Sequence, residues 1–211
     1  MSNVITIAQQ KGGSGKTTLA AHLAVCLSQF HKFNVSILDT DPQGSLGRWY
    51  MLREEKLQKK NLIQFKTASL WGAQYEAKML KQNNDFIIID TPPKIDADGR
   101  PAMQIADIVL IPISPSQVDF WATENIVELA LREKKQILLI INRANVNSKL
   151  IKEARSFAKK LNINQAKTLI GNRQIFVLAM GDGLTSLEKQ KTGKGTFEIK
   201  ELTQEILSNL S

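Results

Sequence analysis

The feature that most constrains the fold of this 211-residue chain is a series of short apolar runs. Their residues do not alternate between apolar and polar, so each run is typical of a strand covered on both faces in a parallel sheet. We expect five such strands at Val4–Ala8, Val35–Leu38, Phe86–Ile89, Ile108–Ile111 and Ile137–Ile141, and two weaker ones at Ile63–Phe65 and Thr168–Ile170.

Segments in which apolar residues recur with the period of an α-helix lie between these runs. The clearest are Lys16–Phe30, Trp71–Lys81, Trp121–Arg132 and Leu150–Leu161. Parallel strands need long crossover connections, and helices supply them. The sequence therefore predicts an α/β fold, with a doubly wound and mostly parallel sheet flanked by helices. In such a sheet the loops after the strands meet at one crevice, where we expect the functional residues.

Composition favours one cytoplasmic domain. The chain is 43% hydrophobic and 23% charged, which provides enough apolar material for a core. It has no apolar run of the roughly 20 residues that a membrane span needs, and its one cysteine, Cys26, excludes an internal disulfide framework. Since no repeat or flexible linker divides the chain, we expect residues 1–211 to form a single domain without a membrane partner.

A glycine-rich segment follows the first expected strand and opens the first expected helix. Its Gly15-Lys16-Thr17 sequence matches the end of the phosphate-binding loop pattern, although Gln10 replaces the first glycine of that pattern. Glycines let backbone N–H groups turn toward phosphate oxygens, the lysine reaches the β- and γ-phosphates, and the threonine hydroxyl binds Mg²⁺. The predicted nucleotide-binding residues of this loop are Gly12, Gly13, Ser14, Gly15, Lys16, Thr17 and Thr18.

Three aspartates follow expected strands and offer carboxylate oxygens. Asp39 and Asp90 end two of these strands, so both can hold Mg²⁺ together with Thr17, directly or through water. Asp41 lies in a loop that Pro42 stiffens, where it can orient the water that attacks the γ-phosphate. We therefore predict Thr17, Asp39 and Asp90 as metal-binding residues, and Lys16 and Asp41 as catalytic residues.

The segment Lys11–Thr18 resembles the deviant Walker motif of the ParA/MinD ATPases, which has an additional lysine at the start of the loop. Ile37–Gly44 is similar to the second motif of that family, and Ile87–Pro93 to its Walker B motif. The resemblance implies a P-loop NTPase fold, ATP and Mg²⁺ as cofactors, and slow ATP hydrolysis stimulated by a partner protein. It adds Lys11 to the ATP-binding and catalytic residues, because this lysine crosses the dimer interface in the family. It also implies that Lys94–Gly99 move with the nucleotide state.

Within this family the chain most resembles the short, ParF-type partition proteins of plasmids and chromosomes, through Trp49, Ile113–Phe120 and Arg173–Phe176. The phosphate loop begins at residue 11, so we expect no helix-turn-helix domain before it. The resemblance implies adenine contacts by Asn142, Arg173 and Gln174. For Asn142, the alternative interpretation is a cap at the end of a strand.

Much of the net charge of +8 lies in the last third of the chain, where residues 143–211 include 12 basic and 6 acidic side chains. Basic residues recur there every three or four positions, which places them on one face of the expected helix Leu150–Leu161. Such a stripe suits contacts with DNA phosphates that read no base, and a solvated helix face is the alternative. The predicted DNA-binding residues are Lys149, Lys152, Arg155 and Lys159.

Several functions fit the resemblance. The first is DNA segregation by a nucleoid-associated homodimer or polymer, driven by ATP, which binds DNA non-specifically and is stimulated by a ParB-like, centromere-binding partner. A ParA-type ATPase that positions a protein cargo is an alternative. A MinD-like membrane ATPase is disfavoured by the net charge of −2 in Phe197–Ser211. A metabolic ATP-dependent ligase is disfavoured by Lys11 and by the lack of a substrate domain.

Overall fold

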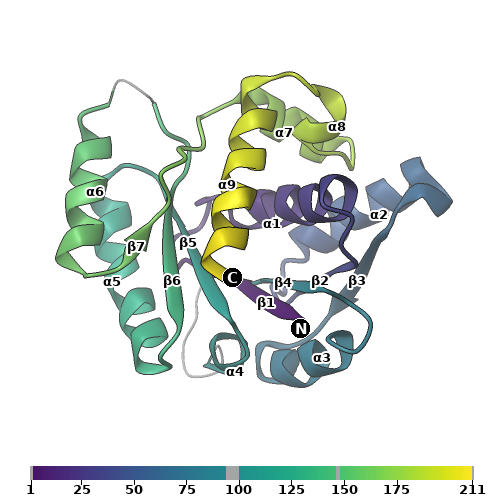
Figure 1. The fold of residues 1–211 in the computed structure, drawn as a ribbon, viewed down its shortest axis with the longest axis horizontal. Coiled ribbons are helices and arrows are strands. Elements are labelled where there is room, and N and C mark those ends of the chain that lie inside the picture. Colours follow the sequence, from purple (N-terminus) through teal and green to yellow (C-terminus); the bar gives the residue numbers. More distant parts are fainter. Residues whose placement is uncertain (1, 94–99, 146–147, 211) are drawn as a thin grey trace.

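The computed structural model describes residues 2–93, 100–145 and 148–210. Within them the chain forms one parallel sheet with helices on both faces (Figure 1). The expected switch segment Lys94–Gly99 lies outside the described residues.

Seven parallel strands make up the sheet, in the order β3-β2-β4-β1-β5-β6-β7. The chain enters at the centre of the sheet and winds outward to both edges, so the predicted doubly wound α/β topology is confirmed. The central strands are buried along almost their whole length because both of their faces are covered. The strands are β1 (Asn3–Ile7), β2 (Val35–Asp39), β3 (Ile63–Thr67), β4 (Phe86–Asp90), β5 (Ile108–Ile113), β6 (Gln136–Ile141) and β7 (Asn164–Gln165).

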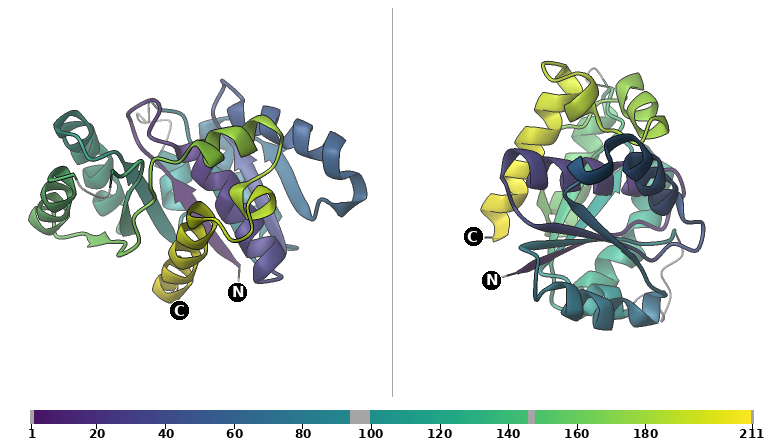
Figure 2. Two further views of the ribbon diagram at one scale, coloured as in Figure 1. Left: turned by 90° about the horizontal axis from the view of Figure 1, so that it is seen from above. Right: turned by 90° about the vertical axis from the view of Figure 1, so that its right-hand side faces the viewer.

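The helices divide between the two faces of the sheet (Figures 1 and 2). One face carries α1 (Lys16–Val25), α2 (Ser45–Leu57), α7 (Gln174–Gly181), α8 (Ser186–Lys189) and α9 (Lys194–Leu210). The other face carries α3 (Ala73–Leu80), α4 (Arg100–Gln104), α5 (Gln117–Arg132) and α6 (Leu150–Lys160). Short irregular turns extend three of these elements, namely η1 (Cys26–Phe30), η2 (Gln58–Lys60) and η3 (Leu70–Gly72).

The strand predicted at Thr168–Ile170 is wrong. The edge strand β7 lies earlier in the chain. In the predicted segment only Ile170 bonds to the neighbouring backbone, at Ile141 and Ala144, and the isolated bridge between Ala144 and Gly171 follows it. The physical reason is Glu205 of α9, whose carboxylate accepts the backbone N–H of Lys167 at 2.7 Å and that of Thr168 at 2.8 Å. These N–H groups are therefore not available to a sheet ladder.

Helix α5 begins four residues before the expected start at Trp121. Ser116 caps the helix, because its hydroxyl accepts the N–H of Asp119 at 3.2 Å. This earlier start places Asp119 in the first turn of α5, where its side chain is buried.

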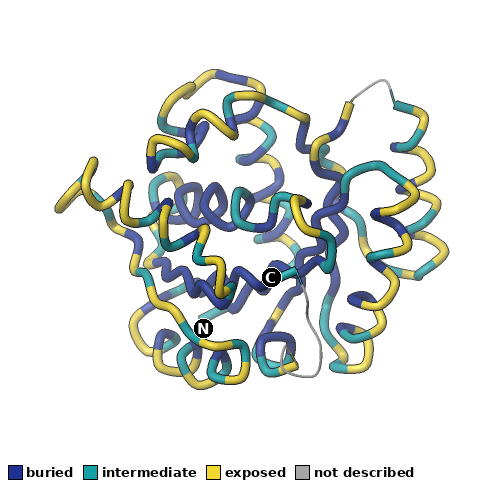
Figure 3. The backbone as a smooth tube through the Cα atoms, turned by 180° about the vertical axis from the view of Figure 1, so that it is seen from behind, coloured by how far each residue is buried: buried dark blue, intermediate teal, exposed yellow. Residues whose placement is uncertain are grey.

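The buried core consists of an apolar layer on each face of the sheet. On one face Ile5 and Ile7 pack with α1, α2 and α9, and on the other Val4 packs with α3 and α4, while Ile111 packs with α5 and α6. Figure 3 shows the buried residues along the strands at the centre of the molecule. Because every residue of α1 from Leu19 to Val25 is also buried, the loop between β1 and α1 is anchored in the core at both ends.

Candidate functional site

The expected crevice lies at the carboxyl ends of β1, β2 and β4. Asp39 and Asp90 are the last residues of β2 and β4, and the parallel register pairs them with each other. Strand β1 runs along the other side of β4, and the glycine-rich loop follows it. The topology thus brings the phosphate loop together with two of the predicted metal-binding residues.

Two glycines give the phosphate loop its shape. Gly13 and Gly15 have φ values of 78° and 93°, in the left-handed region that favours glycine. A Cβ atom on Gly15 would lie 2.3 Å from the side-chain nitrogen of Asn142, so any other residue there would also clash. The loop then enters α1, whose free N–H groups suit an anion.

Gln9 holds the start of the loop in place, although it is not among the predicted site residues. Its Oε1 accepts the N–H of Gln10 at 2.7 Å, and its Nε2 donates to Thr123 Oγ1 in α5 at 2.8 Å. The signal that was available is its position, since Gln9 directly follows the expected strand Val4–Ala8.

Lys16 is buried at the start of α1, and its Nζ donates to the carbonyl oxygen of Gln9 at 3.0 Å. Burial lowers the pKa of this ammonium group, while the nearby charges of Asp90 and Asp41 act in the opposite direction. A phosphate group beside Lys16 would replace the carbonyl oxygen with a charged acceptor and so form a stronger hydrogen bond.

Thr17 and Asp90 form the part of the crevice that best fits Mg²⁺. Thr17 Oγ1 donates to Asp90 Oδ2 at 2.7 Å, while Asp90 Oδ1 is buried and has no hydrogen-bond partner among the described residues. Burial raises the pKa of Asp90 to about 7. A cation would satisfy the orphaned oxygen, and Mg²⁺ typically takes one or two protein oxygens, with water and phosphate completing its shell. The residues present therefore fit this ion.

Asp39 and Asp41 shape the loop that follows β2. The two oxygens of Asp39 accept the N–H groups of Asp41 and Gly47, each at 3.0 Å. Burial raises the pKa of Asp39, and these hydrogen bonds partly oppose the shift. Asp41 is less buried, and its Oδ1 accepts the N–H of Gln43 at 2.9 Å. Asp39 thus holds the backbone of the loop, and its metal-binding role stays a prediction.

Two of the three predicted adenine contacts, Asn142 and Arg173, are engaged elsewhere. Asn142 Nδ2 donates to the carbonyl oxygen of Ser14 at 2.7 Å, so this side chain supports the phosphate loop. The guanidinium group of Arg173 binds both carboxylate oxygens of Glu198, which together with that carboxylate's charge raises the pKa of Arg173. Gln174 is exposed at the start of α7. Contact with adenine stays a prediction for all three.

A pocket of about 650 Å³ opens between the phosphate loop, the loop after β2, α2 and α7. Its lining includes six residues that lie outside the predicted sites and motifs. Arg143 takes a φ of 51°, which is strained for a residue other than glycine. Because Lys16, Arg48 and Arg143 outnumber Asp41 among the charged lining residues, the pocket suits an anionic ligand. The predicted site residues in the lining are Gly12, Gly13, Gly15, Lys16, Thr17, Thr18 and Asp41, joined by Gln43, Trp49 and Pro93 of the sequence motifs. The six additional residues are Ser45, Arg48, Leu52, Arg143, Met180 and Gly181.

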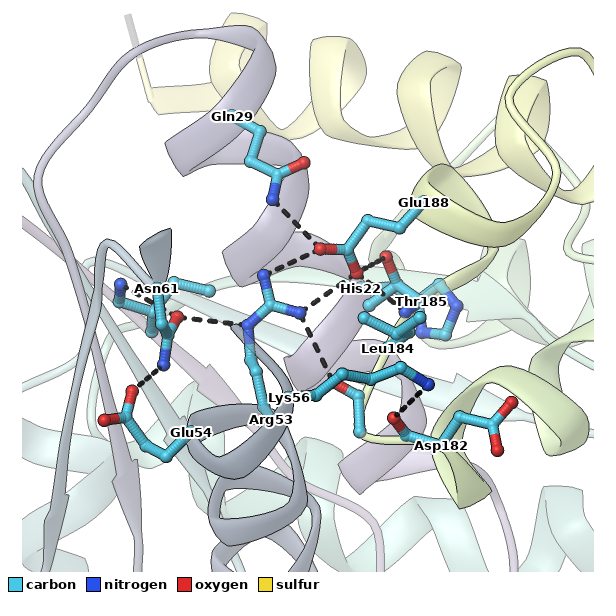
Figure 4. A network of polar contacts seen from close by, with 12 residues as sticks. His22, Gln29, Arg53, Glu54, Lys56, Asn61, Asp182, Leu184, Thr185 and Glu188 are labelled. Atoms are coloured by element: carbon cyan, nitrogen blue, oxygen red, sulfur yellow. Dashed lines mark hydrogen bonds and ion pairs between the residues drawn. The ribbon is translucent and has the colours of Figure 1, made fainter. Parts of the chain in front are cut away.

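A buried polar network holds α1, α2 and α8 together beside this pocket (Figure 4). Arg53 of α2, which is 0% exposed, donates from its two terminal nitrogens to the carboxylate of Glu188 at 3.0 and 2.8 Å. Gln29 donates to the same carboxylate at 3.0 Å. In α1, His22 lies 2.8 Å from the carbonyl oxygen of Thr18 and accepts the N–H of Ser186. The network therefore fixes the helix after the phosphate loop against the helix after Asp41.

The predicted DNA-binding residues lie on the outer side of α6. All four, Lys149, Lys152, Arg155 and Lys159, are exposed, and none forms an ion pair with a described carboxylate. The inner side of the helix buries Ile151, Ala154 and Ala158. Its acidic residue, Glu153, accepts a hydrogen bond from Gln117 of α5 at 2.6 Å. The outer face of α6 therefore offers positive charge that no described acidic side chain neutralises.

At the carboxyl ends of β1, β2 and β4 the chain thus combines an anion-binding loop, a magnesium-compatible pair of oxygens and an acidic loop residue. The family model described as the CobQ/CobB/MinD/ParA nucleotide binding domain matches residues 5–186. "Maintenance of carboxysome distribution protein A" of Halothiobacillus neapolitanus is 26% identical over 212 aligned positions, which cover 96% of this chain and 95% of that protein. "Chromosome partitioning protein ParA" of Myxococcus xanthus is 28% identical over 212 positions, which cover 76% of this chain and 73% of that protein.

The crystal structure of the cell division ATPase MinD of Pyrococcus furiosus has a similar fold. It superposes with a TM-score of 0.82 over 99% of this chain and 100% of that chain, at 20% sequence identity. Within the described part of the chain, no helix has the length and apolar character required to cross a membrane.

Proposed function

The chain belongs to the CobQ/CobB/MinD/ParA nucleotide-binding domain family, and on this premise we propose that it is a ParA-type ATPase for DNA segregation. In the proposed cycle the protein binds Mg²⁺ and ATP and forms a homodimer around two nucleotides. The dimer binds DNA without reading its sequence. It dissociates after a ParB-like protein bound at the centromere stimulates hydrolysis.

The crevice supports the ATPase part of this proposal. Lys16 exchanges the Gln9 carbonyl oxygen for the β- and γ-phosphates, and the loop N–H groups hold the remaining phosphate oxygens. Thr17 and Asp90 would hold Mg²⁺, and the bound ion would supply positive charge beside the phosphates. Asp41 accepts a hydrogen bond from the attacking water and orients it toward the γ-phosphate.

The observation that carries the DNA part is the row of exposed cations on α6, which no described carboxylate neutralises. Each contact with a DNA phosphate releases counterions, so affinity falls as a power of the salt concentration set by the number of contacts. One subunit offers roughly two to four contacts from this face, which gives weak binding at physiological salt. A dimer has twice as many phosphate contacts, which doubles the exponent of the salt dependence and strengthens binding. Because ATP drives the dimerisation, DNA binding becomes dependent on ATP.

A second candidate function is the positioning of a protein cargo by the same ATPase cycle. It is favoured by the relative from Halothiobacillus neapolitanus, which matches over nearly the whole chain and whose name refers to carboxysome distribution. The neighbouring reading frame separates the two candidates. A small, basic ribbon-helix-helix or ParB-like protein beside this gene supports DNA segregation, and a cargo-shell or adaptor protein supports the second candidate.

The test of the proposed function is an electrophoretic shift of random-sequence duplex DNA by the Asp41→Ala protein, which binds ATP without hydrolysing it in our scheme. We expect retention with ATP and Mg²⁺, little retention with ADP, and a steep loss as salt is raised. Dimerisation with ATP but no retention at low salt would contradict the DNA part and leave the cargo-positioning function. An absence of nucleotide binding would contradict the whole proposal.

A further inference from the structure

Lys11 is bound inside its own subunit. Its Nζ lies 2.5 Å from Asp119 Oδ2. The Lys11 side chain is 39% exposed, whereas that of Asp119 is 1% exposed. An ammonium group that solvent reaches therefore covers a carboxylate that solvent does not reach.

Asp119 depends on this ammonium group for its charge balance. Its Oδ2 accepts one further hydrogen bond, from the hydroxyl of Ser116. Its Oδ1 is buried and has no hydrogen-bond partner among the described residues. Lys11 is also the one cation with which Asp119 forms an ion pair in the described part of the chain. A buried carboxylate that loses its cation is strongly unfavourable, so Asp119 holds Lys11 in place.

The carboxylate cannot follow Lys11 out of the subunit. Asp119 lies in the first turn of α5, directly after the Ser116 cap. Its neighbour Phe120 stacks on Phe157 of α6 with ring centroids 5.2 Å apart. One turn later the hydroxyl of Thr123 donates to the carbonyl oxygen of Asp119 at 2.6 Å and accepts from Gln9. A Lys11 side chain that reaches the nucleotide of another subunit must therefore break its contact with Asp119.

From these contacts we propose that Asp119 is a positioning residue that competes with the ATP of a second subunit for Lys11. This inference rests on the proposed ATP-driven dimerisation through Lys11. Only the fraction of subunits whose Lys11 has left Asp119 is competent to dimerise. The apparent affinity of one subunit for another is therefore lower than the intrinsic affinity, in proportion to that fraction. ATP, with its triphosphate charge, draws Lys11 away from Asp119.

The test compares Asp41→Ala with Asp41→Ala/Asp119→Asn, using static light scattering during an ATP titration. Asparagine keeps the shape of the side chain and removes the charge, so we expect the ATP concentration at half-maximal dimerisation to fall by about tenfold. Glu128→Gln is the matched control, because it removes one negative charge from the same helix, where Glu128 pairs with the exposed Arg132. This control should leave the midpoint unchanged.

A second measurement examines the pair without any dimer. Nucleotide-free protein is treated with acetic anhydride, and the acetylation of Lys11 is followed by mass spectrometry with the exposed Lys59 as an internal reference. The ion pair holds the Lys11 ammonium group against the Asp119 carboxylate. We therefore expect Lys11 to react several-fold faster in Asp119→Asn and in a second neutral variant, Asp119→Ser. Equal reactivity in parent and variants would overturn the proposal.

The remaining outcomes are equally decisive. Weaker dimerisation of Asp119→Asn than of its parent would mean that Asp119 presents Lys11 to the other subunit, contrary to the proposal. Ser116→Ala removes the helix cap and the hydroxyl bond to Asp119 but keeps the charge, so it should lower the melting temperature without lowering the ATP midpoint. An equal midpoint shift in Ser116→Ala would assign the effect to loss of helix stability. A parent that does not dimerise with ATP would contradict the proposed function, whereas a dimerising parent without a shift in Asp119→Asn contradicts only this inference.

Discussion

At the scale of single residues, the crevice contains the cation Lys16 and the anion Asp90. Burial disfavours the charged form of each. The pKa of Lys16 is lowered by burial, and that of Asp90 is raised by burial to about 7. Each group is partly stabilised by the charge of the other. A phosphate beside Lys16 and a magnesium ion beside Asp90 would each provide the opposite charge at close range. Ligand binding is therefore expected to stabilise the folded state.

Lys16 and Asp41 should fail in different ways when replaced by alanine. Lys16→Ala removes a charge-assisted contact with the phosphates, so we expect ATP binding to be lost. Asp41→Ala leaves the phosphate loop intact, so we expect near-normal ATP binding and a kcat reduced by about 100-fold or more. Isothermal titration calorimetry and a phosphate-release assay measure the two quantities separately. Equal turnover in Asp41→Ala and the wild type would refute the water-orienting role.

His22 should make the free energy of unfolding depend on pH. Its Nε2 accepts the N–H of Ser186, so the folded chain holds the ring neutral, and burial lowers the pKa of His22 from 6.5 to about 4. Between these values the unfolded chain binds more protons, so stability falls as the pH drops from about 6.5 to about 4. The full effect is about 3 kcal/mol. Urea denaturation at several pH values measures it.

The comparison that isolates His22 uses His22→Gln, since glutamine can also donate to Thr18 and accept from Ser186. We expect a smaller loss of stability toward low pH in this variant than in the wild type. The quantity to compare is the difference in the free energy of unfolding between the two proteins at each pH. The raised pKa of Asp90 makes the folded state more stable as the pH drops, over a range that overlaps that of His22, and the difference cancels this contribution. His31→Gln replaces the other histidine of the chain and should leave the pH dependence as it is. Parallel pH curves for all three proteins would contradict the prediction.

At the scale of elements, the sequence predicted those strands and loops that depend on local pattern. The uniform apolar runs predicted β1, β2, β4, β5 and β6 because central parallel strands are buried on both faces. The motifs likewise predicted which loops line the crevice. Local pattern failed at Thr168–Ile170 and Asp119, since the Glu205 carboxylate and the Lys11–Asp119 pair join distant parts of the chain. Such contacts have no signature in a single sequence.

Helix α6 provides the prediction at this scale. Replacing Lys152, Arg155 and Lys159 together by glutamate reverses the charge of its exposed face, so phosphate contacts become repulsive. We expect retention of random duplex DNA by the Asp41→Ala protein to disappear, while light scattering still detects the ATP-dependent dimer. The electrophoretic shift assay with ATP and Mg²⁺ measures the effect.

The control for α6 reverses a second set of exposed lysines. Lys56, Lys59 and Lys60 lie at the end of α2 and in η2, and all three are exposed. Their replacement by glutamate changes the net charge by the same amount at another part of the surface. Equal losses of DNA retention in the two triple variants would assign binding to net charge rather than to α6. Unchanged retention in the α6 variant would place the DNA-binding surface elsewhere.

At the scale of the whole molecule, the network around Arg53 joins the two halves of the crevice through the C-terminal part of the chain. Arg53 lies in the helix that follows the Asp41 loop, and Glu188 lies in α8, which packs on α1 behind the phosphate loop. Burial raises the pKa of Glu188, but the hydrogen bond and charge of Arg53 outweigh it, so the net shift is downward. The pair therefore persists as ions at neutral pH. It fixes the acidic loop relative to the phosphate loop.

The last prediction is a double-mutant cycle on this pair. Arg53→Met leaves Glu188 without its cation and Glu188→Gln leaves the fully buried Arg53 without its anion, so each single change should cost about 3 kcal/mol or more. With both charges removed, no uncompensated ion remains, and the double variant should lose less free energy of unfolding than the sum of the single losses, by about 2 kcal/mol. Urea denaturation measures the three variants. The same cycle on Arg132 and Glu128, an exposed pair, should show little coupling. Additive losses at Arg53 and Glu188 would mean that packing rather than charge holds α2 against α8.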